Sequence, residues 1–376
     1  MYGIAAEIDP RCADAALAQA RLLRGFGDWR AAGEALRIFL ARHPQPEERG
    51  LAEVHEQYAR LLAGPLEDVE GAVVAYRRAI ALVPERLSAR SALAELLSHR
   101  AGDAAESLSH LRPLMEANPI DATCLRVALR IARARGADTR PGIAVLRALG
   151  IASSYEFDEA GAAADWRPAA ESGLADLHFE TLRQLALEGA AALSAALGTS
   201  GEPASRAASP DSPVRIEDFR AALHRAECEI SAPALLGRTT DEVGSLLRLL
   251  VSVVLDPDAV HGDGRRVNAL SSALTRRMRR RLKKLLEGTT PRSVADTDFA
   301  AWQRELRAFA ATTVLARGSA DLGTALCALV CEDGTGPPLE ARDGDDISAR
   351  VAASPLALAL VRRIVRGWLT RLGEAR

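Results

Sequence analysis

The chain has 376 residues, of which 48% are hydrophobic and 26% charged, a balance typical of a soluble globular protein with more than one domain. Its formal net charge of −2 excludes binding to nucleic acid or membranes through overall charge, so any such partner has to be recognised by a local patch. Aromatic residues make up only 4%, which favours packed helices over a β-sandwich because strands are enriched in aromatic and β-branched side chains.

Four prolines recur at a nearly constant spacing near the start of the chain. Pro10, Pro44, Pro84 and Pro119 are separated by 34, 40 and 35 residues, and they close the similar phrases AAEIDP, LARHP, AIALVP and MEANP. A helix ends before a proline because the ring lacks an N–H donor and crowds the preceding turn. A period close to 34 residues predicts stacked helix–turn–helix repeats.

The prolines and the small residues between them divide residues 1–150 into helical pairs. The complete pairs are predicted to span residues 13–44, 50–84, 88–119 and 122–150. Gly27-Asp28-Trp29 predicts the turn inside the first pair. Pro113 lies inside the second helix of the third pair and predicts a kink or a shortened helix there.

Residues 1–10 read as the end of a second helix whose first helix is missing. A repeat cannot bury its apolar face alone, because each repeat packs only on its neighbours. We therefore expect a capping subunit or a preceding segment to contact Ile4, Ala5 and Ile8.

With Ala20 and Ala32 at the helix contacts and the Gly-Asp-Trp turn between them, residues 1–150 resemble the tetratricopeptide repeat family. The resemblance implies an α-solenoid in which the first helix of each repeat lines a concave groove. On that alignment the predicted partner-binding side chains are Arg21, Arg24, Gln57, Arg60, Arg126, Arg130 and Arg133. Most are cationic, so an acidic segment or a carboxylate terminus is the natural ligand class. The alternative is that several of these arginines are merely exposed.

The rest of the chain is predicted to consist of two helical regions separated by one linker. Residues 151–197 form a helical extension ending in one long amphipathic helix over residues 175–197. Gly, Ser, Pro and Ala crowd residues 198–213, which predicts a flexible linker. Residues 214–376 are expected to form a C-terminal helical domain.

Three phrases of the second half carry a further resemblance: LKKLLEG, DFAAWQRELRAFAATTVLARGSADLGTAL with Trp302 and Asp321-Leu322, and SPLALALVRRIVRGWL with Ser354 and Arg362. These phrases resemble the helical region that follows repeat arrays in large tetratricopeptide proteins of myxobacteria-like bacteria. The resemblance implies a bacterial protein and no known activity.

The stretch TRRMRRRLKKLL is the most strongly basic part of the chain. Leu270, Leu274, Met278, Leu282 and Leu285 recur at steps of three and four, which predicts an apolar stripe along one long helix over residues 266–287. The predicted polyanion-binding residues on its other faces are Arg276, Arg277, Arg280, Arg281, Lys283 and Lys284. Such a helix can bind phosphates or lie on an anionic membrane. The alternative is a solvated helix whose charges are balanced by acidic neighbours.

The sequence contains none of the common catalytic motifs. It contains no His-Glu-x-x-His zinc helix, no phosphate-binding loop, no Gly-x-Ser-x-Gly elbow and no dinucleotide fingerprint. Cys327 and Cys331 share a helix face, but we expect them to pack in the core. We therefore predict no metal, no cofactor and no enzymatic activity. An enzyme with an unrecognised site in the C-terminal domain would need polar groups converging in a pocket.

Five scattered cysteines do not suit a disulfide framework, and the first ten residues lack the features of a secretory signal, so we expect a cytoplasmic protein. The sequence predicts an all-α protein that serves as a non-enzymatic scaffold or adaptor, holding a segment of a protein partner in the groove of its repeats. The first alternative is a polyanion-associated protein acting through residues 276–284. The second is an enzyme.

Overall fold

The computed structural model describes residues 13–42, 49–151, 166–168, 177–198, 216–255, 264–287, 294, 296–333 and 347–374. Over these ranges the protein consists of eighteen α-helices and two short 3-10 turns, without a β-strand, which confirms the predicted all-α class. None of the helices described is both long and apolar enough to cross a bilayer. The predicted capping contact at residues 1–10 and the predicted linker, apart from Gly198, lie outside the described residues.

The chain divides by its internal contacts into two compact units. The N-terminal unit comprises Met1–Thr139 together with Arg371–Arg376, and the second unit comprises Arg140–Thr370. Each unit is considered by itself below.

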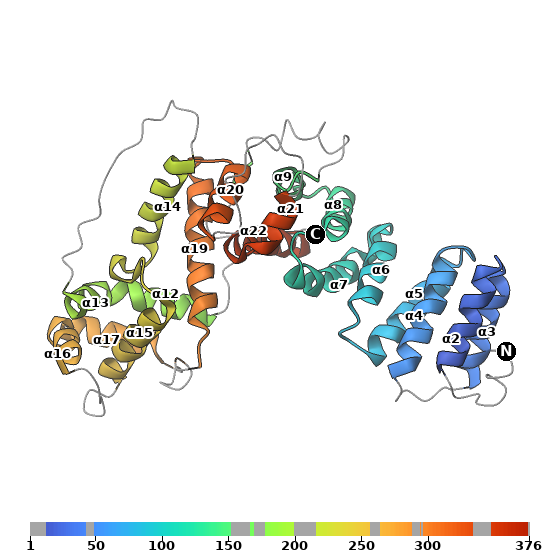
Figure 1. Cartoon of the computed structure of the whole chain (residues 1–376), viewed down its shortest axis with the longest axis horizontal. Helices are drawn as coiled ribbons and strands as arrows, with labels where there is room; N and C mark the ends of the chain where they lie inside the picture. Colours follow the sequence, from blue (N-terminus) through green and yellow to red (C-terminus); the bar gives the residue numbers. More distant parts are fainter. Residues whose placement is uncertain are drawn as a thin grey trace. The chain divides into compact units, whose positions relative to one another are not determined.

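Helices of the N-terminal unit pack on one another in chain order (Figure 1). In addition, α2 contacts α4 and α6 contacts α8, so first helices of neighbouring pairs touch. The bounds agree closely with the predicted repeats: α2 (Ala13–Gly25), α3 (Trp29–Arg42), α4 (Arg49–Ala63), α5 (Val69–Leu82), α6 (Leu87–Ser98), α7 (Ala104–Ala117) and α8 (Ala122–Ala134), with a 3-10 turn over Ala101–Asp103. A solenoid of the tetratricopeptide type stays a prediction.

Local chemistry explains the first turn in this series. Gly27 has φ +78, a left-handed conformation that glycine adopts without a Cβ clash. The Asp28 side chain then accepts a hydrogen bond of 3.0 Å from the Ala31 amide, which satisfies a free N–H at the start of α3. Ala32 is fully buried and lets the two helices approach closely. The predicted turn therefore forms as the sequence indicates.

Helix α7 continues through Pro113 to Ala117, so the shortening considered from the sequence does not occur. Leu111, Leu114 and Met115 are all buried on both sides of the proline. Their packing stabilises helical backbone at a position where proline alone is unfavourable.

The second unit is arranged around α19 (Phe299–Ala316), which packs against α14, α15 and α20. Trp302 on α19 is buried, with its ring centroid 6.3 Å from that of Phe179 and 6.5 Å from that of Phe299. The other helices are α9 (Arg140–Ala148), α12 (Leu177–Glu188), α13 (Ala190–Leu197), α14 (Ile216–Ile230), α15 (Thr240–Leu255), α16 (Gly264–Ala273), α17 (Arg276–Leu285), α20 (Leu322–Glu332), α21 (Ile347–Ala353) and α22 (Pro355–Glu374), with a 3-10 turn over Pro233–Leu235; the last residues of α22 belong to the N-terminal unit.

Two helices predicted to be continuous are each divided in two. The helix expected over residues 175–197 is interrupted at Gly189, where a Cβ would lie 2.6 Å from Cδ2 of Leu250 on α15. The helix expected over residues 266–287 is interrupted at Leu274 and Thr275. Thr275 has an extended ψ of 158, and its hydroxyl accepts a hydrogen bond of 3.2 Å from the Met278 amide. Close packing explains the first break and a helix N-cap explains the second.

The contacts divide the chain differently from the predicted domain boundaries. Helices α12 and α13, predicted as an extension outside the C-terminal domain, pack against α17 and α16. Arg183 on α12 also donates a hydrogen bond of 3.2 Å to the carbonyl of Ile230. Helix α9, predicted within the repeats, packs against α20 of the second unit.

Cleavage inside residues 198–213 should therefore leave the two fragments associated. Phe179, Leu182, Leu185 and Leu193 are buried in the second unit, and their exposure would disfavour separation. We expect a chain with a specific protease site in place of residues 204–209 to elute as one species from a gel-filtration column after cleavage. The two fragments should separate only in denaturant. Elution of two folded fragments in native buffer would instead support the boundary expected from the sequence.

Candidate functional site

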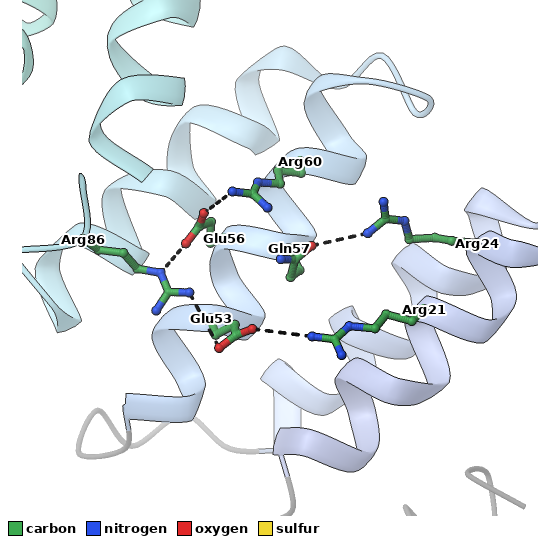
Figure 2. A network of polar contacts seen from close by, with 7 residues as sticks. All are labelled: Arg21, Arg24, Glu53, Glu56, Gln57, Arg60 and Arg86. Carbon is green, nitrogen blue, oxygen red and sulfur yellow. Dashed lines mark hydrogen bonds and ion pairs between the residues drawn. The ribbon is translucent and has the colours of Figure 1, made fainter. Parts of the chain in front are cut away.

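A face of the N-terminal unit brings together seven polar side chains from three elements (Figure 2). Two arginines lie one turn apart on α2, four side chains follow along α4, and one arginine precedes α6. The seven are Arg21, Arg24, Glu53, Glu56, Gln57, Arg60 and Arg86. The four arginines outnumber the two glutamates, so this face is cationic.

Glu56 is at the centre of this network and is only 1% exposed. One carboxylate oxygen accepts a hydrogen bond of 2.5 Å from Nη2 of Arg60, and the other accepts one from Nε of Arg86. A buried carboxylate is strongly unfavourable unless it is paired and hydrogen-bonded, and two guanidinium groups meet that requirement. Because Arg86 is the residue before α6, this pair also connects α4 to the start of the next helical pair.

Contacts at the edge of the network are longer and more exposed. Nη2 of Arg21 lies 3.9 Å from Oε1 of Glu53, and Nη2 of Arg86 lies 3.7 Å from Oε2 of the same glutamate. Nη1 of Arg24 donates a hydrogen bond of 3.4 Å to Oε1 of Gln57, and its guanidinium lies 6.0 Å from the centroid of the Trp29 ring. Exposed ion pairs of this kind contribute little to stability. Arg21 and Arg24 therefore remain available to an external anion.

The structure gathers four of the predicted partner-binding residues on this face, namely Arg21, Arg24, Gln57 and Arg60. The three on α8 have other surroundings. Nη1 of Arg130 lies 2.9 Å from both Ser98 Oγ and His99 Nε2 on the end of α6, and Arg126 and Arg133 also interact within the protein. That all seven bind a partner stays a prediction.

Sequence reasoning missed Glu53, Glu56 and Arg86. For Glu56 a signal was present, because it follows Ala52 by four residues and precedes Ala59 by three, on the buried stripe of α4. An acidic residue in phase with buried alanines indicates a buried ion pair. The partner Arg86 could not be assigned, since it lies 30 residues further along the chain.

The outer face of α2 is unusually apolar for a protein surface. Phe26 is 84% exposed and Leu22 is 45% exposed. These two side chains line an open hollow of about 440 Å³ together with Ala18, Arg21 and Gly25. A contiguous apolar surface with a charged rim is typical of an interaction site, whereas single exposed hydrophobic residues are common.

Helix α17 exposes all six predicted polyanion-binding residues, which are Arg276, Arg277, Arg280, Arg281, Lys283 and Lys284. The seventh basic residue of the helix, Arg279, is half-buried and donates hydrogen bonds to the carbonyl and hydroxyl oxygens of Ser271 at 2.8 and 2.7 Å. It therefore stabilises the junction between α16 and α17.

The second unit contains a cavity of about 620 Å³ whose walls include His224, Glu227, Gln303 and Arg307. Burial raises the pKa of Glu227 above its usual range, although Nε of Arg307 lies 3.1 Å away and opposes the shift. Nη2 of Arg307 also lies 2.7 Å from Oε2 of Glu332. These charged groups pair with one another, which accounts for their burial without a ligand. Among the described residues no cluster of histidine, cysteine or acidic side chains could hold a metal ion.

No protein-family model matches the sequence, and the comparison with curated proteins also finds no match.

Removing the charge of Glu56 should destabilise the N-terminal unit much more than removing that of Glu53. Glu56→Gln leaves Arg60 and Arg86 without their central partner, and we expect a loss of about 2 kcal/mol. Glu53→Gln, the matched control on the exposed edge, should cost less than about 1 kcal/mol. Native-state hydrogen exchange of the α4 and α6 amides measures both values. Equal losses would mean that Glu56 is not the centre of the network.

Proposed function

We propose that the protein is a non-enzymatic scaffold that binds a partner protein through the α2 face, defined as Ala18, Arg21, Leu22 and Gly25 of α2, Phe26 directly after it, and the neighbouring Arg24. The observation that carries this proposal is the 84% exposure of Phe26 beside a hollow bordered by Arg21. Tetratricopeptide-like repeats and a cytoplasmic location are part of the same proposal. The described cysteines Cys124, Cys228, Cys327 and Cys331 are free thiols, which suits a reducing compartment.

The apolar part of this face supplies most of the favourable free energy of binding the partner. Covering a phenylalanine side chain contributes about 1.5–3 kcal/mol, and Leu22 adds a smaller amount because it is already half-covered. Aromatic anchors of this type dominate the energetics of many protein interfaces. A partner should therefore place its own apolar side chains over Phe26 and Leu22.

The charged part of the face selects the partner's chemistry. Arg24 has a neutral hydrogen-bond acceptor in Gln57, and Arg21 lies 3.9 Å from its carboxylate partner. Both guanidinium groups can accept a closer carboxylate from outside, with two parallel hydrogen bonds each. Arg60 is less suited to this role, because the buried Glu56 already binds it at 2.5 Å. The expected ligand is an amphipathic segment with apolar residues on one side and acidic residues beside them.

Two variants test the two parts of the face. Phe26→Ser removes the apolar anchor, and Arg24→Glu reverses a neighbouring charge without disturbing a strong ion pair. Each should weaken binding of the partner at least tenfold, since about 1.4 kcal/mol corresponds to a factor of ten. The measurement is affinity capture from the source organism, followed by titration of the purified partner against each variant.

Matched controls come from exposed positions elsewhere in the same unit. Val74, 55% exposed on α5, is changed to Ser, and the exposed Arg30 on α3 is changed to Glu. Both controls should bind the partner as the unmodified protein does. Unchanged binding by Phe26→Ser and Arg24→Glu would refute the α2 face as the interaction site.

A further inference from the structure

The basic surface of α17 is not neutralised by the protein. Within the part of the chain that the structure describes, none of the six exposed side chains makes a hydrogen bond or an ion pair. Two acidic residues near the helix in the sequence, Glu287 and Asp296, are both exposed and do not pair with these side chains. Like charges at this density repel one another, and a bound polyanion offsets that repulsion.

The six charges form one continuous face. At about 100° per residue, they cover an arc of roughly 160° around the helix, and the ten residues extend over about 15 Å. The opposite side of the helix packs on α12 and α15. A flat or gently curved polyanion can therefore contact several of the six at once.

The apolar residues of this region are already used inside the protein. On α17 itself Leu282 is 0% exposed, while Met278 and Leu285 are half-buried; Leu274 and Leu286, which flank the helix, are 5% and 2% exposed. An amphipathic helix that binds a membrane inserts its apolar face among the lipid chains, whereas the apolar side of α17 is already buried or half-buried inside the protein. This burial disfavours a membrane as the partner.

The type of nucleic acid follows from side-chain chemistry. Residues 264–287 include no phenylalanine, tyrosine or tryptophan, so single-stranded bases have no ring to stack on. Arginine and lysine side chains bind duplex phosphates without such rings. The major groove of DNA, about 12 Å wide, also admits one side of an α-helix.

We propose that α17 binds the phosphate backbone of double-stranded DNA, without strong sequence preference, through Arg276, Arg277, Arg280, Arg281, Lys283 and Lys284. This function is separate from the partner binding of the α2 face, and it belongs to the second unit.

Fluorescence anisotropy with a labelled 20-base-pair duplex of random sequence, titrated with the full chain over a range of salt concentrations, tests the proposal. If five of the six charges meet phosphates, the logarithm of the association constant should fall with the logarithm of salt at a slope of about −4.5. Binding should be weaker for the single strand of the same length. Vesicles of phosphatidylcholine and phosphatidylglycerol, and polyglutamate, should bind less well than the duplex at equal salt.

Two complementary variants each remove three of the six charges. One combines Arg277→Gln, Arg280→Gln and Lys284→Gln, and the other combines Arg276→Gln, Arg281→Gln and Lys283→Gln. Each should bring the slope to about −2, since roughly three phosphate contacts are lost. Neither variant should lower the melting temperature, because these side chains are exposed and unpaired. If one variant fails to fold, the salt dependence of the other variant still tests the proposal.

A control with the same change in net charge combines Arg30→Gln, Arg42→Gln and Arg78→Gln, all exposed in the N-terminal unit. It should retain the slope of the unmodified protein. Absence of duplex binding at low salt, tighter binding to the single strand, the vesicles or polyglutamate, or an equal change of slope in the control would overturn the proposal.

Discussion

The network of seven polar side chains on the N-terminal unit depends on the burial of one carboxylate, that of Glu56. A charged group at this depth is tolerated only with cationic partners, and the fold supplies one from the same helix and one from the residue before the next helical pair. This requirement sets the position of Arg86 relative to α4. It also occupies Arg60, so the inner part of the face is structural.

Some arginines are paired within the protein and others are not. Paired arginines occur in both units, for example Arg60 in the first and Arg307 in the second. In the N-terminal unit, guanidinium groups near α4 are bound to carboxylates, and those on α2 have distant or neutral partners. On α17 the six exposed cations have no partner among the described residues. A guanidinium that already binds a carboxylate must lose that contact before it binds another anion, whereas an exposed and unpaired one loses only its hydration. This difference separates structural arginines from candidates for binding.

Sequence patterns predicted the helices of the N-terminal unit well, because their signals are local. Proline spacing located the pairs, and Gly27 with Asp28 located a turn whose φ and capping hydrogen bond follow from those residue types. The breaks at Gly189 and Thr275 were not predicted, since apolar periodicity continues across both positions. At Gly189 a long-range contact decides, since the glycine lies against Leu250, about sixty residues later in the chain. At Thr275 the break comes from the local N-cap.

The candidate sites were also predictable to different degrees, because some depend on local sequence and others on contacts between distant segments. The six cations of α17 lie close together in the sequence, and their exposure follows from the apolar stripe on the opposite side. The α2 face was found only in part, because Arg21 and Arg24 follow from the repeat alignment whereas the exposure of Phe26 depends on what other chain segments cover. The pairing of Glu56 with Arg86 required the structure, since nothing local connects the two residues.

In the proposed complex α2, and not the paired arginines of α4, contacts the partner. Hydrogen–deuterium exchange of the full chain, with and without the captured partner, measures this directly. If the partner binds α2, exchange should slow for the amides of residues 18–26 and stay unchanged for residues 53–60. Slower exchange confined to α4 or α8, with α2 unchanged, would contradict binding through α2.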